Sequence, residues 1–243
     1  HIKEELKESK YKKVLLPIYK AKSANIVDRL NKGHFVKNAG VDVFFSSLLT
    51  FIGKNNPDLP LDRVNIYLTN YPWPNAFSVG DGNIGINIGL VERIDNVDEL
   101  LFILCHEISH YVLKHSDLGI IKDYERVSSD EYKSAVKALR RKEYRQSSAI
   151  KEFVHQNLLT ERLHQRDYEY EADSMATELM VNCGVARSNV ISALENIDDF
   201  NTPKKFNFGI RTALDLPEVQ IEKSTEGIRM PNSFRPNIFK ETT

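Results

Sequence analysis

The sequence is poor in several features that define other classes of protein. Its 243 residues include two cysteines, Cys105 and Cys183, which are too few for a disulfide framework. Its formal net charge is −1, so bulk charge indicates neither a nucleic acid nor an anionic membrane surface as a partner. No run of 18 or more apolar residues occurs, and we therefore predict no transmembrane segment.

The length suits one well-buried domain, and the composition does not require a second. We therefore predict a single domain over residues 1–243. The chain opens at His1, which leaves its natural start and any signal peptide or anchor open. Oligomeric state and cysteine pairing also stay open; Cys105 lies in an apolar stretch, which favours a small buried hydrophobe.

The most informative stretch is HisGluIleSerHis at 106–110, the His-Glu-x-x-His pattern of zinc metalloproteases. On a helix, two histidines four positions apart share one face, so both imidazoles can reach one ion. The flanking sequence predicts such a helix from about Val97 to His115, with Asn96 as N-cap and Glu99 completing a capping box. The alternative is a buried helix that carries these polar residues by chance, and a third ligand decides between the two.

Candidates for that ligand lie in GluTyrGluAlaAsp at 169–173, inside a predicted helix from about Leu163 to Cys183. Glu169 and Asp173 are one turn apart, so one carboxylate can bind a metal while the other accepts the free N–H of a ligating histidine. Two histidines and a glutamate leave the fourth position for water, as in catalytic zinc sites. We therefore predict one Zn²⁺ per chain.

Segments in the same order occur in the group formed by HtpX, Oma and the CAAX prenyl endopeptidases, family forty-eight of the metallopeptidases, which this chain resembles. The resemblance covers about residues 62–185. Besides the two metal motifs and His115, it rests on AsnAlaPhe at 75–77, GlyAsnIleGlyIleAsnIleGlyLeu at 82–90 and AspGluLeu at 98–100. It implies an α+β, zincin-like (gluzincin) fold, mostly helical with a small sheet. The absence of long apolar runs sets the chain apart from the multi-spanning branch of that family.

The resemblance also assigns roles to the site residues. By that likeness Glu169 is the metal ligand together with His106 and His110, and Glu171 is not a ligand. We expect Glu107 to take a proton from the zinc-bound water and pass it to the leaving amine, and Asp173 to orient a ligating histidine.

The strands expected before the metal helix suggest a place for substrate. Val64, Ile66 and Leu68 alternate with polar residues, which predicts a half-buried strand. After a proline-rich break and a glycine turn, residues 83–90 resume the alternation. In zincins the strand before the metal helix is an edge that binds substrate, so we expect Asn83, Gly85 and Asn87 on such an edge. A bulged edge strand without a ligand is the alternative.

Helices are expected in the remaining parts of the chain. Residues 1–55 are predicted to be helical, although the apolar run at 41–52 also fits a strand. The charged stretch at about 118–165 is predicted as two helices and a loop inserted into the core region. It is either a lid over the cleft or a solvated hairpin, and the hairpin is favoured. Another helix is expected from Ser188 to about Phe200.

The residue that polarises the substrate carbonyl is not determined by spacing. Five side chains are candidates: His115, His155, His164, Tyr168 and Tyr170. His115 matches a frequent histidine of the family, where it is either structural or gates the site. The family's C-terminal His-Pro segment has Leu216 in place of its histidine, with Lys223 or Arg229 as replacements for a transition-state arginine.

The expected function is therefore that of a zinc-dependent endopeptidase on protein or peptide substrates, with protein quality control as its setting. A non-catalytic zincin-fold binding module or chaperone-like scaffold is the alternative, and the intact Glu107 argues against it. A metal-dependent hydrolase of other substrates is a third hypothesis. The resemblance favours the cell envelope or periplasm and leaves the cytoplasm open.

Overall fold

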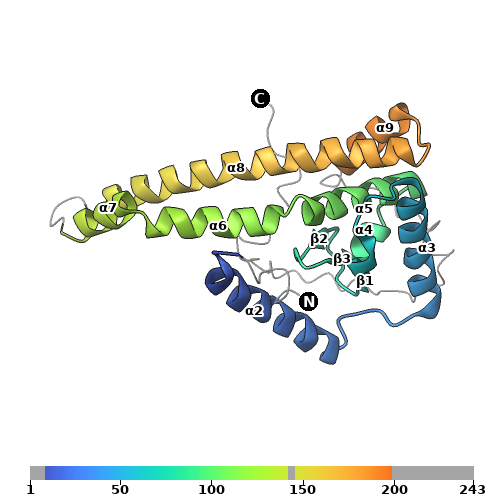
Figure 1. Ribbon diagram of the computed structural model, residues 1–243, viewed down its shortest axis with the longest axis horizontal. Helices are drawn as coiled ribbons and strands as arrows, with labels where there is room; N and C mark the ends of the chain where they lie inside the picture. Colours follow the sequence, from blue (N-terminus) through green and yellow to red (C-terminus); the bar gives the residue numbers. More distant parts are fainter. Residues whose placement is uncertain (1–8, 142–145, 199–243) are drawn as a thin grey trace.

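The structure is a computed structural model that describes residues 9–141 and 146–198 (Figure 1). Within these ranges most residues are helical and one small sheet is present, which confirms the predicted α+β class. The helices are α2 (Lys12–Asn31), α3 (Ala39–Asn55), α4 (Ile88–Val91), α5 (Val97–Val112), α6 (His115–Ser128), α7 (Asp130–Arg140), α8 (Gln146–Asn182) and α9 (Arg187–Asp198), with a short 3-10 turn at Leu61–Arg63. The strands are β1 (Asn65–Thr69), β2 (Ala76–Ser78) and β3 (Asn83–Asn87).

The sheet has the order β1-β3-β2, with β3 parallel to β1 and antiparallel to β2. The predicted first strand is confirmed as β1. The prediction of an edge strand over 83–90 is wrong in two respects. Strand β3 is central, with Gly85 opposite Tyr67 on one side and Phe77 on the other. It also ends at Asn87, where the chain turns into α4.

The core lies between this sheet and the helix pair α5 and α8. Ile84 and Ile86 of β3 are fully buried, as are Leu100, Leu104 and Ile108 along α5. Helix α8 meets α5 with small side chains, because Ala172 and Ala176 are also fully buried. Alanine at such positions lets two helix backbones approach closely, which brings side chains of α5 and α8 within reach of one another.

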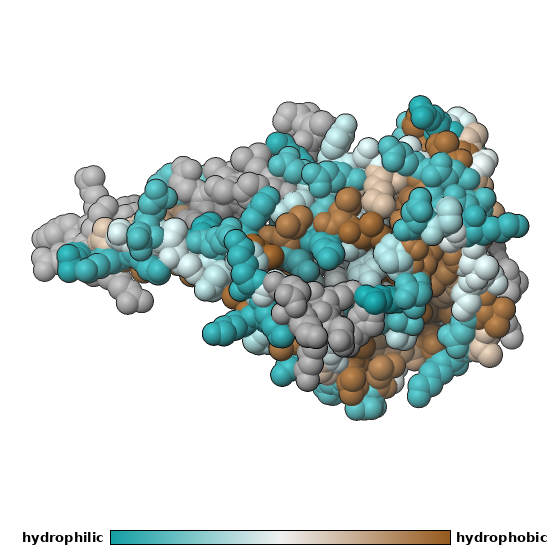
Figure 2. Space-filling model, in the orientation of Figure 1, coloured by the Kyte–Doolittle hydropathy of each residue, from teal (hydrophilic) through white to brown (hydrophobic). Residues whose placement is uncertain are grey.

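A long helical arm leaves this core. Helices α6 and α8 run along each other away from the sheet and are joined through α7 (Figure 1). Figure 2 shows mainly hydrophilic colours over the coloured part of the arm, while apolar side chains gather over the compact end. The arm extends away from the sheet, which supports the solvated hairpin over a lid. It contains α6, α7 and the start of α8 rather than two helices, and the second metal helix begins at Gln146 instead of Leu163.

Helix α2 packs against α6 through a small apolar cluster centred on Leu15 and Tyr19. The Tyr19 hydroxyl donates to the Asp117 carboxylate, and the Lys22 ammonium donates to the Val79 carbonyl at 2.9 Å and the Ser116 hydroxyl at 2.8 Å. Residues 41–52 are helical as part of α3 rather than a strand. No helix in the described ranges is both long and apolar enough to cross a membrane.

Candidate metal centre

Helix α5 begins as its sequence predicts. The Asn96 side chain accepts a hydrogen bond from the Glu99 backbone N–H at 3.0 Å, and the Glu99 carboxylate accepts one from the Asp95 backbone N–H at 2.9 Å. This capping starts the helix, and the helical repeat then places His106 and His110 on one face. The predicted end at His115 is wrong. Lys114 adopts a left-handed conformation (φ 58°), which stops α5 at Val112, and His115 starts α6.

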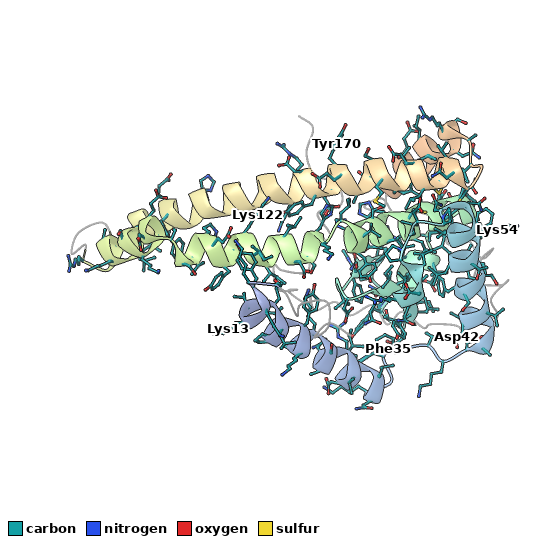
Figure 3. All side chains as sticks on the ribbon, viewed as in Figure 1. Lys13, Phe35, Asp42, Lys54, Lys122 and Tyr170 are labelled. Carbon is teal, nitrogen blue, oxygen red and sulfur yellow. The ribbon has the colours of Figure 1, made fainter. Side chains whose placement is uncertain are left out.

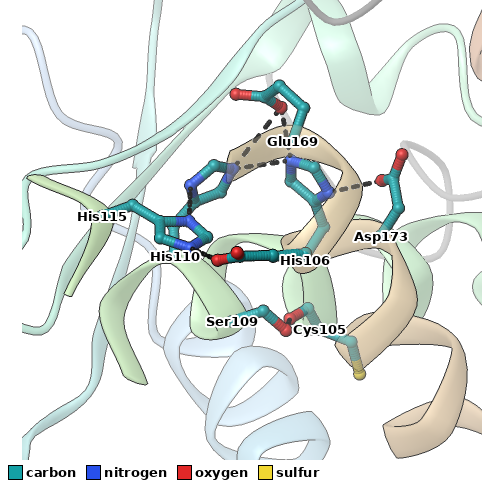
Figure 4. A network of polar contacts seen from close by, with 8 residues as sticks. Cys105, His106, Ser109, His110, His115, Glu169 and Asp173 are labelled. Atoms are coloured by element: carbon teal, nitrogen blue, oxygen red, sulfur yellow. Dashed lines mark hydrogen bonds and ion pairs between the residues drawn. The ribbon is translucent and has the colours of Figure 1, made fainter. Parts of the chain in front are cut away.

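Three ligand atoms converge between α5 and α8 (Figure 4). The Nε2 atoms of His106 and His110 are 3.0 Å apart, and Oε2 of Glu169 is 3.3 Å from the first and 3.5 Å from the second. Ligands about 2.0–2.1 Å from a tetrahedral ion are about 3.3–3.4 Å from one another. The triangle therefore has the size of one face of a tetrahedral shell, which would leave a fourth position for water or substrate.

The tautomer of His106 favours a positive charge between the three ligand atoms. Its Nδ1 lies 2.8 Å from Oδ1 of Asp173, and a carboxylate can only accept, so Nδ1 donates. Nε2 of a neutral His106 then carries a lone pair that faces the carboxylate of Glu169 and Nε2 of His110. Lone pairs this close repel one another unless a proton or a metal ion lies between them. The cluster of His106, His110 and Glu169 is therefore a possible metal site, and Asp173 is placed to orient His106.

The electrostatics of the metal-free cluster agree with this description. Burial lowers the pKa of His106, but hydrogen bonds to Asp173 and Glu169 outweigh it and raise that pKa to about 10. Burial acts to raise the pKa of Glu169, yet its hydrogen bonds to both histidines lower it to about 2. The cluster thus attracts positive charge, either a proton or a metal ion.

Glu107 lies beside the cluster without being a ligand. Its side chain is buried, and burial raises its pKa above the ordinary value. Electrostatic interactions with His106 and His110 oppose this shift, as does a hydrogen bond from the backbone of Ser78. Ser78 belongs to β2, so the carboxylate lies between the metal ligands and one strand of the sheet. A carboxylate whose pKa is raised in this way suits proton transfer.

Sequence reasoning missed the surroundings of His115. Its Nδ1 lies 3.0 Å from Nδ1 of His110, and its Nε2 lies 3.1 Å from Oε2 of Glu171. The imidazole stacks on Tyr168 at 4.6 Å between ring centroids, and Lys122 lies over that same ring at 4.7 Å. Tyr168 and Glu171 are three apart on α8 and so face the same way. This i, i+3 spacing is the feature of the sequence from which a shared contact of Tyr168 and Glu171 could have been predicted.

The residues expected on a substrate edge have other roles. Asn83 is in the central strand, opposite Asn65 of β1. The backbone of Gly85 is paired on both sides, and a Cβ there would lie 2.2 Å from the Phe77 ring, so this glycine accommodates Phe77. Asn87 is buried, accepts from the Thr69 hydroxyl at 2.6 Å and donates to the Trp73 carbonyl at 2.9 Å. The expected glycine face is therefore not a substrate edge.

The remaining candidates separate by position. Tyr170 is 77% exposed and points away from the cluster on the outer side of α8 (Figure 3), and His155 is exposed on the arm. The side chain of His164 and the C-terminal candidates Leu216, Lys223 and Arg229 lie outside the described parts. Cys105 is buried and both cysteines are free, so Cys105 serves as a small core residue.

Comparison with known proteins places these features in a family. The sequence profile described as Peptidase family M48 matches residues 47–232, more than half of the chain. The chain is also similar to the mitochondrial metalloendopeptidase OMA1 of Bos taurus, with 34% identity over 64 residues. That segment is 25% of this chain and 12% of the bovine protein, so the similarity concerns a small part of that relative.

Proposed function

Because the chain belongs to peptidase family M48, we propose that it is a zinc-dependent endopeptidase of one domain that cleaves protein or peptide substrates. The observation that carries the proposal is the triangle of His106 Nε2, His110 Nε2 and Glu169 Oε2, with edges of 3.0, 3.3 and 3.5 Å. Two imidazole nitrogens and a carboxylate oxygen at tetrahedral spacing form a donor set that suits Zn²⁺. When bound, zinc supplies a water of lowered pKa and a Lewis acid for the substrate carbonyl.

The chain's own residues account for the proton movements. Glu107 accepts the proton of the attacking water and donates it to the nitrogen of the leaving amine, so the carboxylate is restored at the end of the cycle. Its raised pKa brings it nearer to neutral pH, where both transfers are feasible. Asp173 accepts a hydrogen bond from the Nδ1–H of His106 and so keeps Nε2 of that residue directed at Glu169 and His110.

Strand β2 takes the substrate-binding role that sequence reasoning gave to residues 83–90. It is at the edge of the described sheet, and β3 occupies one of its sides. The hydrogen bonds from Asn87 N–H to the Asn75 carbonyl and from Val79 N–H to the Asn83 carbonyl show which β2 residues face β3. Backbone hydrogen-bonding groups alternate between the two sides of a strand, so those of Ala76 and Ser78 point away from β3, where the Ser78 N–H binds the Glu107 carboxylate. An extended peptide can add there as a further strand.

Glu107→Gln tests the enzyme against a non-catalytic scaffold. Glutamine keeps the shape but cannot accept the proton, so zinc content should stay near one per chain while peptide hydrolysis falls by about 10²-fold or more. The measurements are elemental analysis, thermal melting and cleavage of a peptide library and an unfolded protein. Glu178→Gln, an exposed glutamate of α8, is the matched control. Cleavage by Glu107→Gln at the wild-type rate would show that the proposed mechanism is wrong.

Two other functions give different results in the same experiment. A scaffold that binds unfolded clients would lose nothing in Glu107→Gln and would bind the unfolded protein without cleaving it. A hydrolase of other substrates would bind zinc but leave the peptide library intact. Degradation of an unfolded protein but not of its folded form would support a role in quality control.

A further inference from the structure

The second metal ligand, His110, has a polar partner of its own behind the ligand triangle. Its Nδ1, which points away from Glu169, lies 3.0 Å from Nδ1 of His115. The opposite nitrogen of His115, Nε2, lies 3.1 Å from Oε2 of Glu171. The side chain of His115 is 4% exposed and that of Glu171 is 57% exposed. A carboxylate at the surface is thus linked through a buried histidine to a metal ligand.

Protons can occupy this chain of contacts in only one way that leaves His110 ready to bind a metal. Ligation through Nε2 requires a lone pair on that atom, so the proton of neutral His110 must lie on Nδ1. The short contact between the two Nδ1 atoms then requires His115 to accept at Nδ1, since two N–H groups cannot face each other at this distance. The remaining proton of a neutral His115 lies on Nε2, where the Glu171 carboxylate accepts it.

We propose that His115 and Glu171 form a positioning pair that holds His110 in the Nδ1-protonated tautomer and so directs its Nε2 at the metal. The proposal rests on the metal-binding part of the proposed function and does not require peptidase activity. The pair gives His110 the support that Asp173 gives His106. The difference is that the carboxylate acts through an intervening histidine. Glu171, which is not a ligand, is thereby assigned a role.

Packing alone would also hold His115 in place, so an experiment must separate the two effects. His115 stacks on Tyr168, and Lys122 lies over the same tyrosine ring. His115→Phe keeps an aromatic ring for this stack but removes both hydrogen-bonding atoms. His115→Gln loses the stack but keeps an oxygen that can accept from His110 and an amide that can donate to Glu171.

Zinc affinity, measured by competition with a chromophoric chelator, is the first readout. Loss of such a partner typically weakens binding by about 10–100-fold, and we expect this range for His115→Phe with unchanged thermal melting of the metal-free protein. His115→Gln should recover most of the affinity. Glu171→Ala should weaken binding less, because water can replace an exposed carboxylate, and Glu178→Ala on the same helix should have no effect. Equal affinity of wild type and His115→Phe would overturn the proposal.

The second readout needs neither zinc nor activity. Nitrogen-15 NMR of the histidine rings distinguishes a protonated ring nitrogen from a bare one, and the metal-free protein can be examined above the usual titration range of histidine. We expect His110 to carry its proton on Nδ1 in wild type and to populate both tautomers in His115→Phe. A wild-type His110 protonated on Nε2 would overturn the proposal. If the wild-type protein bound no zinc, the proposed function would be refuted. The NMR measurement would still show whether His115 and Glu171 fix the tautomer of His110.

Discussion

His106 and Glu169 hold opposite charges in the metal-free protein, and this sets the conditions for metal uptake. The carboxylates of Asp173 and Glu169 raise the pKa of the buried His106 to about 10, so its imidazole carries a proton throughout the neutral range. Glu169, with a pKa of about 2, is ionised over the same range. A metal ion must therefore displace a proton from His106 but none from Glu169.

Zinc affinity should consequently rise with pH. At pH values below the His106 pKa of about 10, a proton on this imidazole competes with zinc. Zinc affinity should therefore increase by about tenfold per pH unit across the neutral range. Calorimetric titrations in buffers of different ionisation enthalpy would count the released protons. Asp173→Asn removes a group that raises this pKa, so fewer protons should be released, while affinity falls about 10–100-fold. Zinc binding without proton release would contradict the described electrostatics.

Side-chain geometry within one helix could be predicted from the residues, and the approach of Glu169 and Asp173 to the histidines of α5 from the two metal motifs and the resemblance, whereas the contacts of His115 could not. The spacing of His106 and His110, and of Glu169 and Asp173, follows from the helical repeat. The partnership of His115 with Glu171 depends on the turn at Lys114, which places His115 in a new helix. No glycine marks that turn, so the sequence predicted a longer α5.

Among the elements, β3 differs most from its predicted role, and Gly85 gives a direct test. A side chain at Gly85 would meet the Phe77 ring, so Gly85→Val should destabilise the protein by about 1–3 kcal/mol, the usual cost of overpacking. Thermal or denaturant unfolding would measure this loss. A substrate edge would instead predict normal stability with slower cleavage. Gly119→Ala is the matched control, because a Cβ there meets nothing within 4 Å and alanine favours the helix.

Periodicity predicted β1 and β3 but neither β2 nor the order of the strands. Alternation in the sequence indicated these two strands, but the burial of their residues does not alternate: Leu68 and Thr69 are both buried in β1, as are all residues from Ile84 to Asn87 in β3. Which strand is central depends on pairing between distant segments, and β2 is only three residues long. Likewise, the charged stretch before Glu169 has no helix breaker, so α8 extends far into the arm.

At the scale of the whole molecule, α8 joins two parts with different surroundings. Its C-terminal half packs against α5 and carries Glu169 and Asp173, and its N-terminal half belongs to the arm. A disturbance of the outer arm should therefore leave the metal centre intact, unless it reaches the last turn before Glu169 or His115 at the start of α6.

Two proline substitutions at exposed residues of α8 test this independence. Proline inside a helix costs about 3 kcal/mol or more and bends it. Lys151→Pro lies in the arm and should leave zinc affinity unchanged, whereas Asp167→Pro, two residues before Glu169, should weaken it by about tenfold or more. Zinc titration and circular dichroism would be measured for both. Equal losses of affinity would mean that the arm and the metal centre act as one unit.

The short length of β2 limits how this protein could select a target. Of the outward backbone groups at Ala76 and Ser78, the Ser78 N–H already binds the Glu107 carboxylate, so the strand could pair with only a brief run of main chain. Main-chain pairing does not depend on side-chain identity. A segment already paired within a folded protein has no main-chain groups to offer. Selection at this edge would therefore follow the loss of structure in the target, and a protein would become vulnerable wherever local unfolding releases a strand.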